Sequence, residues 1–176
     1  LGKNNINIRA IAQGASEKNI STVIAQKDVK KALNTIHERF FEDQSKQLNV
    51  FITGVGNVGE RLVEQIKQQK KFLKVQLKIN LRVIGLSNSR TMLFNDSGLS
   101  LKTWKDDLAI GEKATLEGFL ERIKKFNLRN SIFVDVTANE QVSNIYADYL
   151  KENIAIVACN KIACSSDYEI QCAFFV

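Results

Sequence analysis

Apolar and polar residues follow two different patterns along the chain. Residues 5–13 alternate at first, as a half-buried strand does, and residues 20–25 form a second, β-branched run. A helix is expected to follow Asp28, a favourable N-cap. Its apolar stripe would contain Val29, Ala32, Leu33, Ile36 and Phe40. A β-β-α piece of this size cannot bury its own apolar faces, so it must pack on something else.

Beyond this first piece, strand patterns alternate with helix patterns. Strands are predicted where four apolar runs occur, at 48–53, 81–86, 132–136 and 154–158. Strands that are apolar almost throughout and separated by helices are typical of a parallel sheet covered on both faces. Right-handed crossovers would make this sheet doubly wound. The expected fold class is therefore α/β, a Rossmann-like doubly wound parallel sheet preceded by a partial β-β-α unit.

Helical periodicity predicts which residues of the second region face inward. The helix from Asn57 is expected to bury Val58, Leu62, Val63 and Ile66, and a helix near 115–127 follows an irregular stretch that ends around Trp104. One further helix is expected to bury Val142, Ile145, Tyr146, Tyr149 and Leu150. Ser166 and Glu169 have the spacing of a capping box that would open another helix.

Composition and charge narrow the function classes. The 176 residues are 44% hydrophobic and 25% charged, which is ordinary for a globular protein. The formal net charge of +6 comes from scattered basic residues rather than from a basic tract with aromatics, so nucleic-acid binding is not supported. A positive potential would also suit a phosphorylated cofactor. No apolar run reaches the ~18 residues of a membrane helix, and no signal-peptide layout is present, so no membrane contact is expected.

Cysteine and histidine usage argues against metal chemistry. The three cysteines Cys159, Cys164 and Cys172 have no metal-ligand spacing, and His37 is the single histidine. Reduced thiols in a cytoplasmic protein are the expected state. Neither a metal site nor a Ser-His-Asp triad is therefore expected in this chain.

A glycine-rich turn lies between the predicted strand at 48–53 and the helix that follows. It consists of Gly54, Val55, Gly56, Asn57, Val58 and Gly59. In a dinucleotide-binding turn the first glycine permits a tight bend, the second lets backbone approach the pyrophosphate, and the third lets helix and strand pack closely. The strand–turn–helix context favours nucleotide binding over a glycine-rich turn that binds nothing.

The next strand end predicts the cofactor's identity. Ser87, Asn88, Ser89 and Arg90 follow the run that ends at Leu86, and none of them is a carboxylate. A carboxylate there would accept hydrogen bonds from the ribose 2′-hydroxyl of NAD and would repel a 2′-phosphate. Hydroxyl and amide groups with the guanidinium of Arg90 suit the phosphate better, so NADP is favoured, or dual use with NAD. The alternative is that Arg90 is a solvated loop cation.

Two further strand ends carry candidate residues. Thr137 could contact the nicotinamide ribose or amide, whereas Thr137 or Asn139 could instead cap the following helix, and these roles do not exclude one another. Lys161 could place charge near the cofactor or the reacting carbonyl, or be a solvated surface lysine. Asp135 is expected to be a structural, hydrogen-bonded carboxylate rather than a base. Gln13, at the end of an early strand, could bind an amino-acid ligand or be a polar turn residue.

Two modules on one chain resemble a known family. Residues 7–17 and 19–21 look like the end of the second ACT regulatory domain of an aspartokinase. Residues 51–59, 85–89 and 134–137, with Asn160 and Lys161, resemble the nucleotide domain of homoserine dehydrogenase. Their order resembles the bifunctional aspartokinase–homoserine dehydrogenases. The resemblance divides the chain as follows: 1–43 as ACT remnant, 44–48 as linker, 49–169 as NAD(P)-binding domain and 170–176 as a tail that departs from the family.

The resemblance implies an activity and partners. That family interconverts L-homoserine and L-aspartate 4-semialdehyde with NAD(P), and its kinase half phosphorylates aspartate on the route to threonine and methionine. By position, residues 54–59 would hold the pyrophosphate, residues 87–90 the adenosine ribose end, and Thr137 and Lys161 the nicotinamide half. Gln13 would contact threonine as an effector. A homo-oligomeric complete enzyme in the cytoplasm is expected.

The departures from the family limit what this chain should do alone. The kinase domain, most of the ACT pair and the substrate-binding and dimerisation domain have no counterpart here, so no catalytic residue is assigned and the fragment is expected to be inactive by itself. Two other interpretations remain open. One is an amino-acid-sensing ACT module with a non-catalytic nucleotide-binding domain, and the other is a Rossmann domain of another NAD(P) enzyme.

Overall fold

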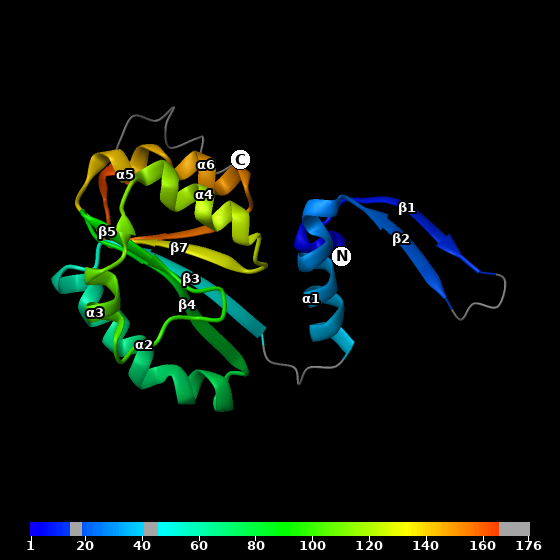
Figure 1. Ribbon diagram of the computed structural model, residues 1–176, viewed down its shortest axis with the longest axis horizontal. Coiled ribbons are helices and arrows are strands. Elements are labelled where there is room, and N and C mark those ends of the chain that lie inside the picture. The colour runs from blue at the N-terminus through cyan, green and yellow to red at the C-terminus, as the bar shows by residue number, and fades with distance from the viewer. Residues whose placement is uncertain (15–18, 41–45, 166–176) are drawn as a thin grey trace. The chain divides into compact units, whose positions relative to one another are not determined.

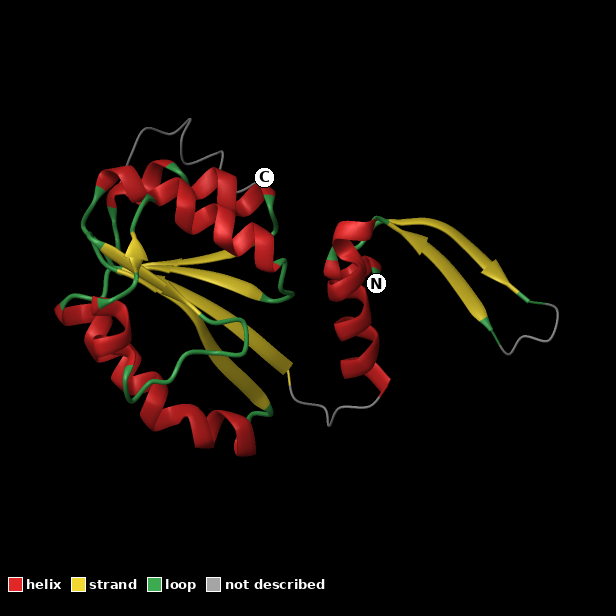
Figure 2. Cartoon of the chain, in the orientation of Figure 1, coloured by secondary structure: helices red, strands yellow, loops and turns green. Residues whose placement is uncertain are grey.

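The computed structural model describes residues 1–14, 19–40 and 46–165, which form two compact units. Unit 1 contains Leu1–Gln44 with Asn127–Arg129, and unit 2 contains the remainder. Figure 1 labels the elements of both units, and Figure 2 distinguishes helices from strands. The expected capping box at Ser166 and Glu169 and the tail at 170–176 lie outside the described residues.

Unit 1 is a hairpin followed by a helix, as the sequence pattern predicted. A short 3-10 helix, Gly2–Asn4, precedes strands β1 (Ile8–Gln13) and β2 (Ile20–Ile24), which pair antiparallel. A second 3-10 helix, Gln26–Asp28, leads into α1 (Val29–Phe40). Most of the predicted apolar stripe of α1 is exposed, 62% for Leu33 and 76% for Phe40, while Ala32 is buried. The described residues therefore do not bury this stripe, in line with the expectation that a β-β-α piece cannot do so alone.

Unit 2 is a six-stranded sheet with the order β6-β5-β4-β3-β7-β8. Its strands are β3 (Lys46–Thr53), β4 (Ile79–Ser87), β5 (Thr91–Phe94), β6 (Glu112–Lys113), β7 (Ser131–Asp135) and β8 (Ala155–Ala158). The central pairs β4–β3, β3–β7 and β7–β8 are parallel. The predicted parallel, Rossmann-like core is thus present. The sheet is nevertheless mixed, because β5 pairs antiparallel with both β4 and β6.

Helices cover both faces of this sheet. They are α2 (Asn57–Gln76), α3 (Trp104–Ala109), α4 (Leu116–Phe126), α5 (Glu140–Asn144), α6 (Tyr146–Lys151) and α7 (Ile162–Ser165). Figure 1 shows α2 and α3 on one face and α4, α5 and α6 on the other. Coverage of both faces explains why the central strands read as nearly continuous apolar runs.

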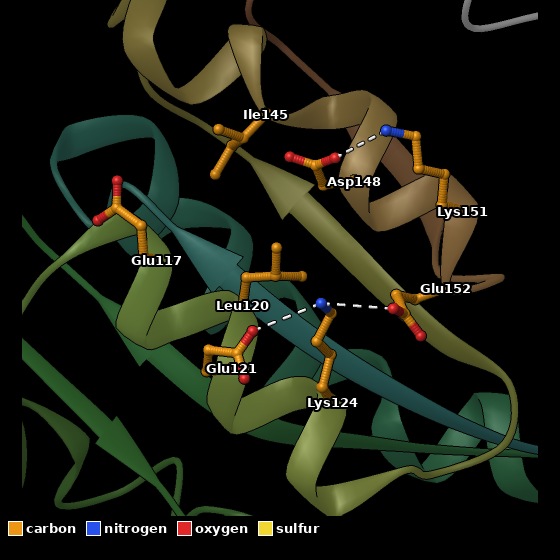
Figure 3. Close-up of a pocket in the computed structure, with 8 residues that line it drawn as sticks. All are labelled: Glu117, Leu120, Glu121, Lys124, Ile145, Asp148, Lys151 and Glu152. Carbon is orange, nitrogen blue, oxygen red and sulfur yellow. Dashed lines mark hydrogen bonds and ion pairs between the residues drawn. The ribbon is translucent and has the colours of Figure 1, made fainter.

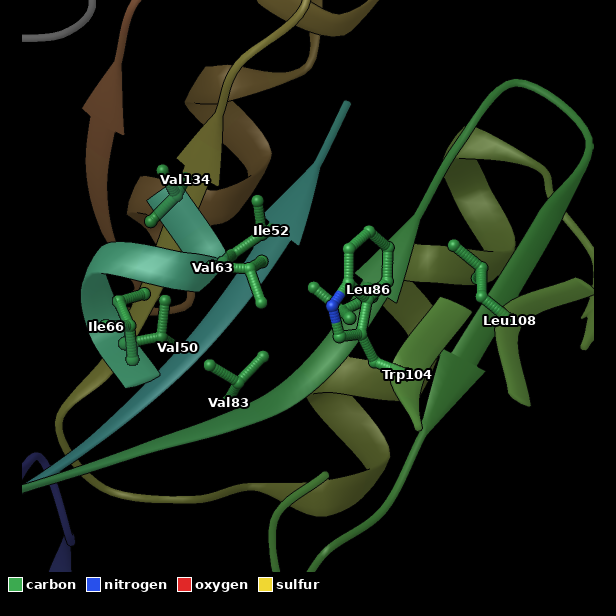
Figure 4. Packing of buried hydrophobic residues seen from close by; sticks show 9 residues of the cluster. All are labelled: Val50, Ile52, Val63, Ile66, Val83, Leu86, Trp104, Leu108 and Val134. Atoms are coloured by element: carbon green, nitrogen blue, oxygen red, sulfur yellow. The ribbon is translucent and has the colours of Figure 1, made fainter. Parts of the chain in front are cut away.

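One apolar cluster fills the space between α2 and the sheet. In Figure 4, Val63 and Ile66 of α2 lie over Val50 and Ile52 of β3. Val83, Leu86, Trp104, Leu108 and Val134 complete the buried cluster. Burial of such side chains supplies most of the favourable free energy that holds a helix on a sheet.

Four predicted details differ from the structure. Val58 is 60% exposed, because it lies in the first turn of α2 and only later turns pack on the sheet. The stretch predicted to be irregular contains β5, a run of four residues that is too short for a strand pattern to stand out. The single helix predicted after Asn139 is two helices, α5 and α6, separated at Ile145. Strand β3 begins at Lys46, so the expected linker 44–48 overlaps it.

The core cluster makes a testable prediction about stability. Val63→Ala removes buried methyl groups of a side chain that is 1% exposed, and should lower the free energy of unfolding by about 2 kcal/mol. Val75→Ala, in the same helix at 54% exposure, is the matched control, and should change it by less than about 0.5 kcal/mol. Urea unfolding followed by circular dichroism measures both. Equal effects of the two substitutions would contradict the packing described here.

Candidate functional site

A cleft of about 570 Å³ opens where β3, β4 and β7 end at their carboxyl termini. This is where an open α/β sheet places ligands, beside the point where the strand order reverses around β3. The lining residues are Thr53, Gly54, Val55, Gly56, Ser87, Asn88, Ser89, Ala114, Thr115, Leu116, Phe119, Phe133, Val136, Thr137, Asn139, Gln141, Val142 and Tyr149. The cleft therefore joins the glycine turn to two of the three other strand ends selected from the sequence, those at residues 87–89 and at Thr137 and Asn139, but does not include Lys161 in its lining.

Gly54 makes the first bend of the turn. Its φ of +97° lies in the region that disfavours any side chain, and its N–H donates to the carbonyl of Ser87 at 2.8 Å. A Cβ at this position would lie 2.7 Å from Cγ2 of Thr137. The missing side chain therefore allows the end of β3 to approach the end of β7 closely.

Gly56 and Gly59 have different surroundings. Gly56 is the N-cap of α2, and a Cβ there would meet no atom within 4 Å. A Cβ on Gly59 would instead collide with the carbonyl oxygen of Gly54. Gly59 thus lets α2 pack against the turn, while Gly56 leaves open space in the cleft.

The start of α2 is suited to an anion. No side chain caps this helix, and the N–H groups of a first helical turn have no acceptor within the helix. The macrodipole of the 20-residue helix adds a partial positive charge at this end. An anionic group entering the cleft would find donors and a favourable field at this point.

The loop after β4 uses the side-chain oxygen of Asn88 to bind its own backbone. Oδ1 of Asn88 accepts from the backbone N–H of Arg90 and of Thr91, each at 2.7 Å. The hydroxyl of Ser87 donates to the carbonyl of Asn88 at 3.0 Å. With these groups engaged, the side chains facing the solvent from this loop are rich in donors: the amide nitrogen of Asn88, the hydroxyl of Ser89 and the guanidinium of Arg90.

The structure shows which residue after β7 caps the following helix. Asn139 is the N-cap of α5, and its Oδ1 accepts from the N–H of Gln141 at 2.9 Å. The hydroxyl oxygen of Thr137 accepts from the N–H of Asn139 at 3.2 Å and does not cap the helix. Thr137 lines the cleft with its hydroxyl proton uncommitted in these hydrogen bonds.

One wall of the cleft is aromatic and contains Phe119, Phe133 and Tyr149. The rings of Phe133 and Tyr149 stack with centroids 4.0 Å apart and an interplanar angle of 12°. Burial, and then the negative charge of Asp135, raise the pKa of the Tyr149 phenol well above its ordinary value. The Tyr149 phenol is therefore protonated and uncharged in the wall of the cleft.

Several residues selected from the sequence lie outside the cleft lining. Arg90 is exposed and directly follows Ser89, which lines the cleft, and Lys161 is exposed in the segment after β8. Asn57, Val58 and Gly59 form the first turn of α2. Gln13 ends β1 in unit 1 and is exposed there. The cleft brings together the first three residues of the glycine turn with Ser87, Asn88 and Thr137. Gln13 belongs to unit 1.

Sequence reasoning missed one wall of the cleft. Ala114, Thr115 and Leu116 precede or begin α4, and Phe119 follows one turn later. The available signal was Thr115, whose hydroxyl oxygen accepts from the N–H of Gly118 at 3.0 Å as a helix cap does. Nothing in the local pattern shows that this helix start lies beside the glycine turn.

A second hollow lies between α4 and α6, and Figure 3 shows Lys124 between Glu121 and Glu152, and Lys151 beside Asp148. Lys124 bridges Glu121 and Glu152 at 3.4 and 3.3 Å, and Lys151 pairs with Asp148 at 3.1 Å. The carboxylates of Glu152 and Glu121 raise the pKa of Lys124. Exposed pairs of this kind contribute little to stability.

Two features are absent from the described segments. Within residues 1–14, 19–40 and 46–165, no helix combines the length and the apolar composition needed to cross a bilayer. Those same segments contain no group of three or more His, Cys, Asp or Glu side chains placed to hold a metal ion.

Family models match both units. Residues 1–40 match an ACT domain, and residues 54–173 match the model described as homoserine dehydrogenase, NAD binding domain. Among curated relatives, a bifunctional aspartokinase/homoserine dehydrogenase of Arabidopsis thaliana is 42% identical over 93% of this chain and 18% of its own length. A Haemophilus influenzae protein of the same name is 40% identical over 93% of this chain and 20% of its length. The chain thus spans about a fifth of the length of these relatives.

Solved structures share the fold. A hyperthermophilic archaeal homoserine dehydrogenase mutant, solved in complex with NADPH, aligns with a TM-score of 0.59 at 21% identity, over 74% of this chain and 41% of that one. The homoserine dehydrogenase of Thermoplasma acidophilum aligns with a TM-score of 0.57 at 17% identity, over 73% and 40%. These similarities show a Rossmann-like nucleotide fold.

The surroundings of Gly56 and Gly59 predict that alanine substitutions at these two positions have different effects on stability. Gly59→Ala should lower the free energy of unfolding by about 1–3 kcal/mol, because its methyl group would collide with backbone that cannot move without bending the turn. Gly56→Ala, three residues away with open space around its Cβ, should change it by less than about 0.5 kcal/mol. Thermal and urea unfolding compare the two variants. A destabilising Gly56→Ala with a neutral Gly59→Ala would contradict the geometry.

Proposed function

The chain belongs to the homoserine dehydrogenase NAD-binding domain family, and from that membership we propose that it is the cofactor-binding part of a bifunctional aspartokinase–homoserine dehydrogenase. The observation that carries the proposal is the glycine turn, in which Gly54 bends, Gly56 leaves room and Gly59 permits close packing. The complete enzyme would interconvert L-homoserine and L-aspartate 4-semialdehyde, and phosphorylate aspartate in its kinase half.

The cleft has a place for each part of a nicotinamide dinucleotide. The pyrophosphate would lie against Gly56 and the first turn of α2, and the adenosine ribose end against Ser87–Arg90. Thr137 would contact the nicotinamide half, with Lys161 nearby. When bound, the cofactor supplies or accepts the hydride. This chain's residues bind and orient it, while the acid–base and substrate-binding groups would come from the domain that follows in the relatives.

We further propose that NADP is preferred over NAD. The loop after β4 has no carboxylate, and its acceptor Oδ1 of Asn88 is already taken by two backbone N–H groups. Outward-facing donors and the exposed guanidinium of Arg90 favour a 2′-phosphate over a 2′-hydroxyl that seeks an acceptor.

A second function rests on the ACT match over residues 1–40. We propose that, in the complete homo-oligomeric enzyme, this unit is part of a threonine-responsive regulatory domain, with Gln13 at the end of β1 as a contact. Because the described residues leave the α1 stripe exposed, the unit is proposed to be completed by further ACT sequence. Threonine binding to this chain without any NADPH binding would favour a purely regulatory module over an oxidoreductase part.

The first test of the proposed function uses Gly56→Val. The wild-type chain should bind NADPH, followed by nucleotide fluorescence and calorimetry, and Gly56→Val should raise the Kd at least about tenfold because its side chain fills the space left for the pyrophosphate. Gly14→Val is the matched control, because Gly14 also has open space around its Cβ and belongs to unit 1. Equal NADPH affinity of the wild type and Gly56→Val would refute the assignment of the turn.

The cofactor preference is tested at Arg90. Arg90→Asp should weaken NADP⁺ binding by about 10–100-fold, because it removes a charge-assisted hydrogen bond and places a carboxylate beside the 2′-phosphate, while NAD⁺ affinity changes by less than about threefold. Lys70→Asp, at an exposed position of α2, makes the same change in net charge away from the β4 loop. If both variants lowered NADP⁺ affinity equally, general electrostatic attraction would explain the effect and Arg90 would have no specific role.

A further inference from the structure

Asp135 is a fully buried carboxylate for which the proposed function so far has no role. It is 0% exposed at the last residue of β7. Burying a carboxylate is unfavourable unless hydrogen bonds compensate it. Three neutral donors do so: the N–H of Thr137 at 2.7 Å, the hydroxyl of Tyr146 at 2.5 Å and the amide Nδ2 of Asn160 at 3.1 Å.

The two oxygens of Asp135 hold different parts of the cleft. Oδ1 accepts from Thr137, whose side chain lines the cleft and contacts the bend at Gly54. Oδ2 accepts from both Tyr146 of α6 and Asn160 beyond β8. All three partners donate, so the position requires a group that only accepts. A carboxylate meets this requirement and an amide of the same shape does not.

Asn160 extends the connection to the neighbouring strand end. Its side chain is buried, and its Nδ2 also donates to the carbonyl of Asn139 at 3.0 Å. Its Oδ1 accepts from the N–H of Ile162 at 3.1 Å, which fixes the backbone on both sides of Lys161. Asp135 and Asn160 together therefore tie the Thr137–Asn139 loop to the segment that carries Lys161.

We propose that Asp135 is a positioning residue that sets the nicotinamide side of the cleft, acting through Thr137 and Asn160 without touching the cofactor. This inference rests on the proposed function, since it assumes that the nicotinamide half lies along Thr137 and Lys161. The adenosine side depends on a different set of hydrogen bonds, those that Asn88 makes with Arg90 and Thr91. Loss of the Asp135 connection should therefore affect one half of the cofactor and not the other.

The test compares NADPH with 2′,5′-ADP, which carries only the adenosine half. Asp135→Asn keeps an acceptor for Thr137 but turns an NH₂ group toward the amide of Asn160, so two donors oppose each other. It should raise the Kd of NADPH about tenfold and change the Kd of 2′,5′-ADP less than about twofold. Tyr146→Phe removes one donor and leaves the carboxylate in place, and should raise the NADPH Kd about threefold with 2′,5′-ADP again unchanged. Emission of the bound reduced nicotinamide reports the same site directly and should shift toward that of free NADPH in both variants.

Asn49→Ala is the control for a general loss of stability. Asn49 is also fully buried and accepts from Nε and Nη2 of Arg82, but it lies in the first half of β3. Its substitution should lower the melting temperature without changing the ratio of the two Kd values. A folded Asp135→Asn that keeps the wild-type ratio, or that weakens both ligands equally, would overturn the proposal. If Asp135→Asn does not fold, a Tyr146→Phe variant that keeps the wild-type ratio of the NADPH and 2′,5′-ADP Kd values would also overturn the proposal. A wild-type chain that binds neither ligand would instead refute the proposed function itself.

Discussion

The close approach of the Gly54 and Gly59 backbones is the constraint on which the nucleotide end of unit 2 depends. Because neither residue carries a Cβ, α2 can begin directly against the bend that follows β3, and Thr137 can pack over the same bend from β7. This brings two strand ends and one helix N-terminus together around a single cleft. A side chain at either position would force these elements apart and so change the shape of the cleft.

Much of this arrangement could be predicted from sequence because its causes are local. The glycine spacing, the apolar runs of β3, β4, β7 and β8, and the helical stripe of α4 each lie within a short window and depend on backbone sterics or burial. Residues whose placement depends on pairing at a distance were not predictable in the same way. Strand β5 is short and lies antiparallel at the edge of the parallel core. Thr115 and Phe119 join the cleft through the path of the chain between β5 and α4, which no local pattern encodes.

Asp135 shows the same limit for chemistry. The sequence placed it in a strand and indicated a structural carboxylate, and the structure agrees, with 0% exposure and three donors. Two of those donors, Tyr146 and Asn160, are 11 and 25 residues away. Their convergence follows from the β7–β8 pairing and from the break between α5 and α6. The single continuous helix that the periodicity predicted already turned Tyr146 inward, but that pattern did not indicate that its hydroxyl would reach Asp135 at the end of β7.

The two ends of the cleft are built to tolerate change differently. At the end proposed for adenosine, Ser89 and Arg90 are exposed, and Asn88 holds the loop through hydrogen bonds with backbone groups. Substitutions at Ser89 or Arg90 should therefore have little cost to folding, so the proposed 2′-phosphate contact can change without loss of the fold. At the other end, Thr137, Asp135 and Asn160 share one buried hydrogen-bond network, in which removing one partner leaves another unsatisfied. The proposed determinant of cofactor preference can thus vary independently of the fold, whereas the geometry of the proposed nicotinamide side cannot.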